Sequence, residues 1–126
     1  MGLTIKIYLT DDDGGKYMGI GVMWLLDEVG KTGSLRKAAG NLDIAYSKGY
    51  SMIKRAEEAL GVPLLDRRKG GKGREGSSLT PFAKEFLELY RSFQQEVKDK
   101  AVEPYQRFTA ALEELKRSEE NGRSSV

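Results

Sequence analysis

Apolar and polar residues alternate along the first segment of the chain, over Leu3–Thr10. A period of two predicts a half-buried β-strand. Asp and Gly fill residues 11–15, and both tolerate the left-handed conformations that a tight reversal needs. The chain is therefore expected to begin with a hairpin, in which Lys16–Gly19 forms a short return strand.

Three segments with helical spacing come next, over Ile20–Val29, Leu35–Leu42 and Ala45–Leu60. The first is apolar around most of its circumference, which indicates burial on more than one side, in the core, in a dimer contact or in both. Ser34 stands where it can cap the second helix, and Gly61 ends the third. A helix-turn-helix arrangement is therefore predicted.

The third of these helices has two unlike sides. One side is apolar, and the other carries hydroxyl groups and cations, from Ser47, Lys48, Ser51, Lys54 and Arg55. Beyond Gly61 the chain is extended over Leu64–Lys69, passes through a basic, glycine-rich loop at residues 70–76 and returns over Ser77–Leu79. This pattern predicts a β-hairpin with a cationic tip.

A long helical pattern follows Thr80-Pro81, which suit an N-cap and a first helical position. Apolar residues recur every three or four positions to Val97 and resume after Pro104, which is expected to kink the helix or start a new one. A small domain cannot cover a seam this long, which favours dimerisation, although packing back on the same core is the alternative. The predicted division is a domain with the helix-turn-helix and the hairpin over 1–80, a dimerisation segment over 81–118 and a frayed, flexible tail over 119–126.

Composition narrows the possible chemistry. The 126 residues include no Cys and no His, which excludes disulfides, thiolate nucleophiles, zinc ribbons and His-based catalysis. The segment 71–76 has the spacing GxGxxG, but no helix opens directly after it, so no nucleotide site is expected. The chain is predicted to be neither an enzyme nor a metal or cofactor protein. Without a signal peptide or a membrane-spanning run, a cytoplasmic location is expected.

The net charge of +2 hides an uneven distribution. Residues 31–76 contain eleven basic and five acidic residues, a net charge of +6, and the remainder carries −4. An excess of this kind indicates a polyanionic partner, whereas the simpler interpretation is a solvated charged face.

The predicted order of elements is helix, helix, turn, helix and basic hairpin. This order is that of a winged helix-turn-helix, a fold that is mainly α with a small β component. A helix fits the major groove, where side chains distinguish base pairs, and cations on the wing neutralise phosphates. Backbone N–H groups at the helix that Ser34 begins could hold a further phosphate.

Several motifs resemble the N-terminal domain of ModE-type molybdate-responsive regulators. They are Thr32–Ala39, Tyr46, Gly70–Gly73 and Leu79–Pro81, within a similarity that runs from about Leu3 to Tyr90. The resemblance implies a dimerising winged helix that binds palindromic operators in double-stranded DNA. It also implies that Tyr46, Ser47, Lys48 and Ser51 face DNA, with Lys72 and Arg74 on the wing.

The chain departs from this family at four places. Asp43 stands where the family usually has a turn glycine, and Ala45 where a serine usually caps the third helix. Ser47 and Tyr50 replace the usual lysine and tryptophan. The molybdate-binding modules of the full regulators are expected to be missing. A weaker resemblance, at Ile53–Arg55 and Leu60–Leu64, links the chain to LysR-type regulators.

The resulting hypothesis is a homodimeric, sequence-specific transcriptional regulator. Its predicted DNA-binding residues are Ser34, Tyr46, Ser47, Lys48, Ser51, Lys54, Arg55, Arg68, Lys69, Lys72 and Arg74. The alternative is a winged-helix module that binds another protein through its hairpin and aromatic seam. An unidentified effector or sensor protein stays open as a further partner, and no membrane is expected.

Overall fold

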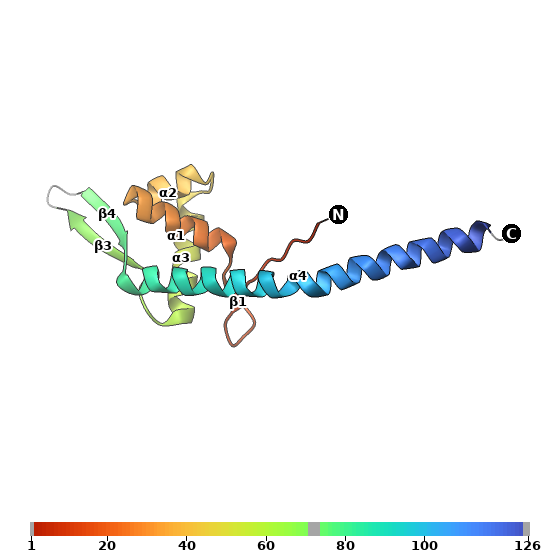
Figure 1. The fold of residues 1–126 in the computed structure, drawn as a ribbon. Coiled ribbons are helices and arrows are strands. Elements are labelled where there is room, and N and C mark those ends of the chain that lie inside the picture. Colours follow the sequence, from red (N-terminus) through yellow and green to blue (C-terminus); the bar gives the residue numbers. More distant parts are fainter. Residues whose placement is uncertain (1, 71–73, 125–126) are drawn as a thin grey trace. The chain divides into compact units, whose positions relative to one another are not determined.

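The computed structural model describes residues 2–70 and 74–124. In chain order the elements are β1 (Leu9–Thr10), β2 (Lys16–Met18), α1 (Ile20–Thr32), α2 (Leu35–Asn41), α3 (Tyr46–Leu60), β3 (Leu65–Gly70), β4 (Arg74–Leu79) and α4 (Pro81–Ser124) (Figure 1). The chain divides into two compact units, one over Lys6–Tyr90 and the other comprising the residues up to Ile5 together with those from Arg91 onward.

The core of the Lys6–Tyr90 unit lies where α1, α2, α3, β2, β3 and the first turns of α4 meet. Its buried side chains are Met18, Val22, Leu25, Leu26, Val29, Leu35, Ala38, Ile53, Ala56, Leu64, Leu65, Ala83, Leu87 and Tyr90. The side of α1 that includes Ile20 and Trp24 is exposed. The core therefore takes one side of this strongly apolar helix and leaves the other to solvent.

The predicted helices of the helix-turn-helix are present, and their ends follow capping chemistry. Ser34 Oγ accepts a hydrogen bond of 3.1 Å from Lys37 N, which confirms the N-cap of α2. α1 runs three residues beyond the predicted Val29, because the left-handed residue that ends it is Gly33, whose φ is 70°. The N–H of Gly33 donates to the Val29 carbonyl oxygen and closes the last turn.

The strand predicted over Leu3–Thr10 is wrong for most of its length. Only Leu9 and Thr10 pair with another strand, because β2 has three residues and aligns Leu9 with Met18. Within the described part of the chain no strand lies beside residues 3–8. The carbonyl oxygen of Ile7 instead accepts a hydrogen bond of 2.7 Å from Tyr90 Oη. An alternating pattern defines the faces of a strand but does not provide its partner.

α4 continues through Pro104 and through the polar segment after it, so no second helix starts at the proline. The tail predicted over 119–126 is also wrong for residues 119–124, which are helical. The turn before these residues contains ion pairs between side chains one turn apart, such as Glu113–Lys116 at 3.9 Å and Glu114–Arg117 at 2.6 Å. Such pairs and the high helix propensity of Glu, Lys and Arg offset the lack of apolar packing.

β3 and β4 form the predicted hairpin, antiparallel from the pair Leu65–Leu79 to the pair Gly70–Arg74. The return strand begins at Arg74, three residues before the predicted Ser77, since the glycine-rich sequence continues the ladder. This confirms the winged helix-turn-helix and the fold class, mainly α with small antiparallel sheets. No helix among the described residues is long and apolar enough to cross a membrane.

Candidate nucleic-acid interface

α3 separates its core side from its polar side. Gly49, Ile53 and Ala56 are buried, and a Cβ atom at Gly49 would lie 3.4 Å from Cβ of Ala39 on α2. α2 and α3 thus pack closely at this point, where an added Cβ atom would make ordinary van der Waals contact. The opposite side exposes the hydroxyls and ammonium groups of Ser47, Lys48, Ser51 and Lys54. The first turn of α3 carries no acidic residue that would repel a polyanion.

Two tyrosines and two arginines connect α3 to its neighbours on either side. The guanidinium carbon of Arg36, on α2, lies 4.3 Å from the ring centre of Tyr46. The Tyr46 and Tyr50 rings are one helical turn apart, with centres separated by 6.3 Å. Arg67, on β3, lies with its guanidinium carbon 4.8 Å from the Tyr50 ring centre. We call these four residues the Arg–Tyr ladder.

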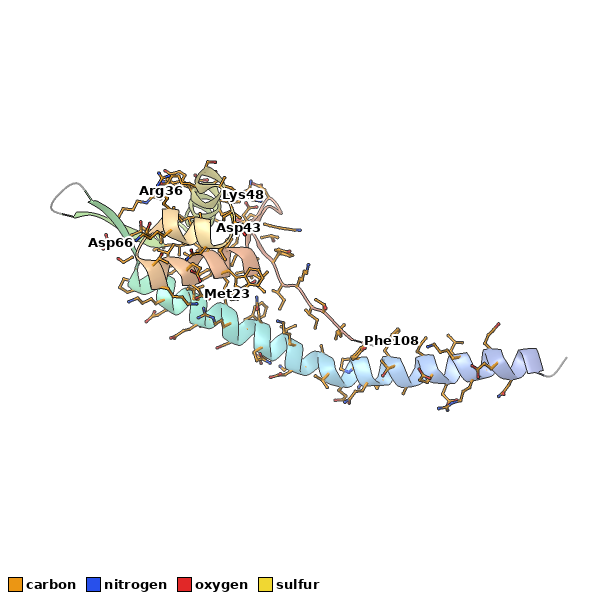
Figure 2. The ribbon with its side chains drawn as sticks, turned by 90° about the horizontal axis from the view of Figure 1, so that it is seen from above. Met23, Arg36, Asp43, Lys48, Asp66 and Phe108 are labelled. Atoms are coloured by element: carbon orange, nitrogen blue, oxygen red, sulfur yellow. The ribbon has the colours of Figure 1, made fainter. Side chains whose placement is uncertain are left out.

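The Arg–Tyr ladder holds the guanidinium groups of Arg36 and Arg67 next to the polar side of α3. A cation over an exposed tyrosine ring gains about 0.5–1 kcal/mol, and the ring restricts the long arginine side chain. Neither Arg36 nor Arg67 forms an ion pair with a carboxylate in the part of the chain that the structure describes, so both guanidinium groups keep donors for another acceptor. Figure 2 shows Arg36 and Lys48 on the same side of the Lys6–Tyr90 unit.

Sequence reasoning named Tyr46 but missed Arg36, Tyr50 and Arg67 as members of one cluster. The spacing of Tyr46 and Tyr50 by four residues is visible in the sequence and indicates that their rings are neighbours. The two arginines lie on different elements, and no spacing along the chain relates them to these rings. Their contribution appears only when α2, α3 and β3 are assembled.

The other predicted site residues on the helices have defined surroundings. Ser34 is engaged as the cap of α2, as described above. Arg55 is exposed and its Nη1 donates a hydrogen bond of 3.4 Å to the Lys16 carbonyl oxygen on β2. Lys48, Ser51 and Arg55 also border one groove beside α1. Arg55 is thus separated from the ladder and belongs to the α1 side of α3.

The predicted wing residues lie on the hairpin. Arg68 and Lys69 are in β3 and Arg74 is in β4, while Lys72 is outside the described residues. In the antiparallel pairing of β3 with β4, Arg68 lies opposite Gly76 and Lys69 lies opposite Glu75.

The base of this hairpin is fastened to the helices at three places. Glu57, on α3, accepts a hydrogen bond of 2.7 Å at its carboxylate from Leu64 N. Ser77 N donates to the Gly33 carbonyl oxygen at 2.9 Å, and Thr80 N donates to the Leu64 carbonyl oxygen at 3.0 Å. These bonds, which we call the wing root, set the direction in which the hairpin leaves α3.

No group of three or more acidic side chains in the described ranges is arranged to hold a metal ion. The residues on α3 and in the Arg–Tyr ladder supply hydroxyl, ammonium, guanidinium and aromatic groups. This combination is suited to phosphate oxygens and base edges, because these groups are donors or stacking surfaces.

Three curated proteins resemble the chain over 52% to 60% of its length. ModE of Haemophilus influenzae, a transcriptional regulator, is 35% identical over 66 residues, which are 52% of this chain and 26% of that protein. The molybdenum transport protein ModE of Herbaspirillum seropedicae is 34% identical over 56% of this chain and 26% of its own length. The molybdenum-pterin-binding protein MopB of Rhodobacter capsulatus is 29% identical over 60% of this chain and 28% of its own length. The chain thus spans about a quarter of the length of these relatives.

Two solved structures are also similar. ArgP of Mycobacterium tuberculosis has a TM-score of 0.47 at 22% identity, over 65% of this chain and 29% of that chain. DarR of Vibrio fischeri, determined in complex with DNA, has a TM-score of 0.46 at 23% identity, over 68% of this chain and 28% of that chain.

A model of the bacterial regulatory helix-turn-helix proteins of the lysR family matches residues 22–84. These residues include most of α1, all of α2 and α3, the wing and the start of α4. They make up half of the chain, and the ModE relatives support the resemblance drawn from the sequence. The chain belongs to the bacterial regulatory helix-turn-helix proteins of the LysR family.

Proposed function

We propose that the protein is a homodimeric regulator of transcription that recognises a specific, palindromic sequence of double-stranded DNA. The observation that carries the proposal is the polar side of α3, where exposed hydroxyl and ammonium groups are flanked by the Arg–Tyr ladder. The width of a major groove accommodates one α-helix, and this side of α3 carries the donors that base edges accept.

Each group has a role in this proposal. Ser47, Lys48, Ser51 and Lys54 approach the bases, and Tyr46 stacks between them and Arg36. The ladder arginines, Arg55 and the wing residues Arg68, Lys69, Lys72 and Arg74 hold phosphates. Free backbone N–H groups at the start of α2, which Ser34 caps, are a further phosphate contact.

A second copy of the chain is proposed to cover α4. Within the Lys6–Tyr90 unit, α4 buries Ala83, Leu87 and Tyr90 and leaves Phe82 and Leu89 exposed. In the other unit the same helix exposes Phe93, Val102, Phe108 and Leu115. By helical spacing Phe93, Phe108 and Leu115 share one side of α4, and Val102 lies on the opposite side. The shared side is a self-complementary apolar surface for a two-fold dimer.

Fluorescence anisotropy with a duplex selected from random sequence tests DNA recognition. The protein is expected to prefer the selected duplex to a scrambled one by about 10³-fold or more, and its affinity is expected to fall steeply with salt. Equal affinity for both duplexes at raised salt would reject sequence-specific regulation and favour the protein-binding module.

Paired variants separate base reading from phosphate contact. Ser51→Ala should reduce the preference for the selected duplex, whereas Arg36→Ala should weaken binding to both duplexes alike. Lys84→Ala, which removes an exposed cation from α4, is the matched control and should leave both affinities unchanged. A loss with Lys84→Ala as large as that with Arg36→Ala would mean that only overall charge matters.

A further inference from the structure

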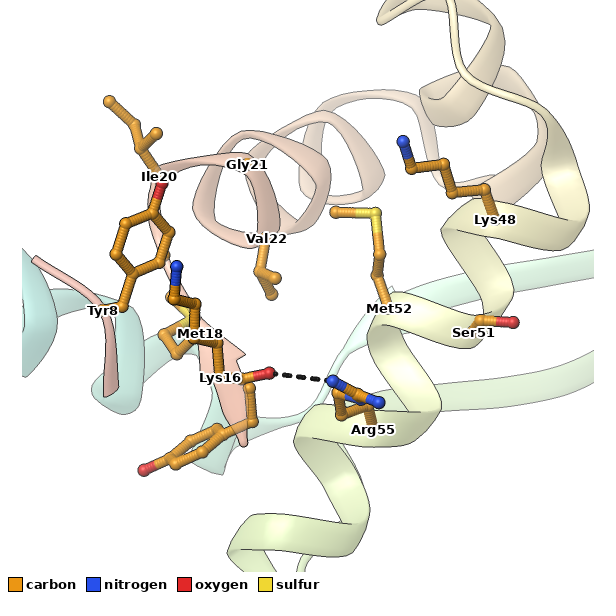
Figure 3. Close-up of a pocket in the computed structure, with 12 residues that line it drawn as sticks. Tyr8, Lys16, Met18, Ile20, Gly21, Val22, Lys48, Ser51, Met52 and Arg55 are labelled. Atoms are coloured by element: carbon orange, nitrogen blue, oxygen red, sulfur yellow. Dashed lines mark hydrogen bonds between the residues drawn. The ribbon is translucent and has the colours of Figure 1, made fainter. Parts of the chain in front are cut away.

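A groove of about 590 Å³ lies between the start of α1, β2 and α3 (Figure 3). Its volume is within the range of small-molecule sites in proteins. The residues that line it are Tyr8, Lys16, Tyr17, Met18, Gly19, Ile20, Gly21, Val22, Lys48, Ser51, Met52 and Arg55. We call it the α1–α3 groove.

The floor of the groove is apolar and partly formed by backbone. Met18 and Val22 are buried at its base, and Met52 points from α3 toward α1. Gly21 has no side chain on this wall, and a Cβ atom there would lie 3.7 Å from Cε of Met52. Flat backbone next to a methionine leaves room for a planar or narrow apolar group, and methionine sulfur contacts aromatic rings favourably.

The rim of the groove is cationic. Lys16, Lys48 and Arg55 border it, and no carboxylate is among its lining residues. None of these cations has an ion-pair partner within the described residues; Lys16 Nζ lies 4.4 Å from the Tyr8 ring centre, and Arg55 reaches only a backbone carbonyl. Three positive groups around an apolar floor complement a molecule with one apolar end and one anionic end.

We propose that the α1–α3 groove binds a small amphipathic carboxylate, with the apolar body over Gly21, Val22 and Met52 and the carboxylate among Lys16, Lys48 and Arg55. Lys48 and Ser51 line this groove and also belong to the polar side of α3. A bound carboxylate therefore competes with DNA for Lys48 and lowers DNA affinity. This second part rests on the proposed function, whereas ligand binding itself does not.

The first experiment measures binding without DNA. We titrate the full chain with 3-phenylpropionate and follow the backbone amides of Gly19 and Gly21 by NMR. Saturable shifts at these amides are expected, with binding at least about tenfold weaker for 3-phenylpropan-1-ol, which lacks the charge, and for propionate, which lacks the apolar body. Absence of saturable shifts, or equal binding of the alcohol, would overturn the proposal.

Variants locate the site. Gly21→Leu fills the floor and Lys16→Ala removes a rim cation that is not on α3, so both should weaken binding by at least about tenfold. Gly21→Ala, whose Cβ makes an ordinary contact, and Lys84→Ala, outside the groove, are the matched controls and should bind nearly as the unmodified chain does. Circular dichroism melting checks that each variant is folded. Unchanged binding by folded Gly21→Leu would place the ligand elsewhere and reject the groove.

The second experiment adds the selected duplex. 3-Phenylpropionate should raise the apparent Kd for DNA with the unmodified chain and should have no effect with Gly21→Leu. If Gly21→Leu alone abolishes DNA binding, the groove is occupied by DNA and the proposal is wrong. Lack of specific DNA binding would reject the proposed function while leaving the NMR result intact, so the two failures are distinguishable.

Discussion

At the scale of single residues, the turn between α2 and α3 shows how this chain differs from the family it resembles. Asp43 has a φ of 57°, a left-handed conformation that glycine adopts more easily than other residues. Ala45 is the N-cap of α3 and makes no side-chain cap hydrogen bond. The two departures noted in the sequence therefore lie at the two backbone positions where glycine and serine have a physical advantage.

Ala45→Ser is expected to raise the free energy of unfolding by about 1 kcal/mol, because the hydroxyl can accept from a free N–H in the first turn of α3. Chemical denaturation measures the change. Ala45→Val, which adds a side chain without a hydroxyl, should give no such gain. A destabilised Ala45→Ser would show that the first turn of α3 is already satisfied in another way.

The residue scale also marks a limit of sequence reasoning. The exposed positions of α3 follow from helical spacing, since Ser47, Lys48, Ser51 and Lys54 alternate with buried residues in a regular way. The Arg–Tyr ladder could not be derived in this manner. It depends on the angle between α2 and α3 and on the start of β3, which are set by close contacts such as that of Gly49 with Ala39.

At the scale of elements, the wing depends on a carboxylate of α3. Glu57→Ala is expected to lower the free energy of unfolding by about 1–3 kcal/mol, because the buried Leu64 N–H loses its acceptor. Glu57→Gln, which keeps an acceptor oxygen, should lose less. Thermal and chemical denaturation report both changes.

Glu58→Ala, at the neighbouring exposed position, provides the control for removing a charge from this end of α3. Equal losses for Glu57→Ala and Glu58→Ala would show that charge alone matters and that the wing root contributes nothing specific.

Pro104 lies inside α4, where it cannot donate a helical hydrogen bond. Its exposed position lets water satisfy the carbonyl that it leaves without a partner, which explains why the helix continues. Pro104→Ala should stabilise this part of α4 by up to about 3 kcal/mol, seen as slower amide hydrogen exchange in the following turn. Gln106→Ala should change the exchange little, and unchanged exchange in Pro104→Ala would mean that this turn opens for another reason.

The bounds of an element could be predicted where the sequence contains a residue type that ends or begins a helix. Glycines in the left-handed conformation and the Ser34 and Thr80 caps fixed the helix ends to within a few residues. The N-terminal strand failed because pairing requires a second strand, and β2 offers only three residues. The predicted end of α4 was wrong because ion pairs one turn apart replace apolar periodicity there.

At the scale of the whole molecule, dimerisation through α4 is a prediction. Phe108→Glu should shift the chain toward monomer in sedimentation equilibrium, because a charge would be buried in the apolar contact. Gln106→Glu makes the same change of charge at an exposed polar position and is the control. A chain that is monomeric without any substitution, or a Phe108→Glu dimer as tight as the original, would contradict the arrangement.

The wing root has a consequence for the thermodynamics of DNA recognition. Its hydrogen bonds, two between backbone groups and one to the Glu57 carboxylate, join the hairpin to α1, α3 and the start of α4. The hairpin base and α3 are therefore ordered together when the chain folds. The loss of conformational freedom at this base then belongs to folding and not to association. Contacts made by α3 and by the hairpin base would accordingly form in a fixed register, with a smaller entropy loss on binding than a freely hinged hairpin would incur.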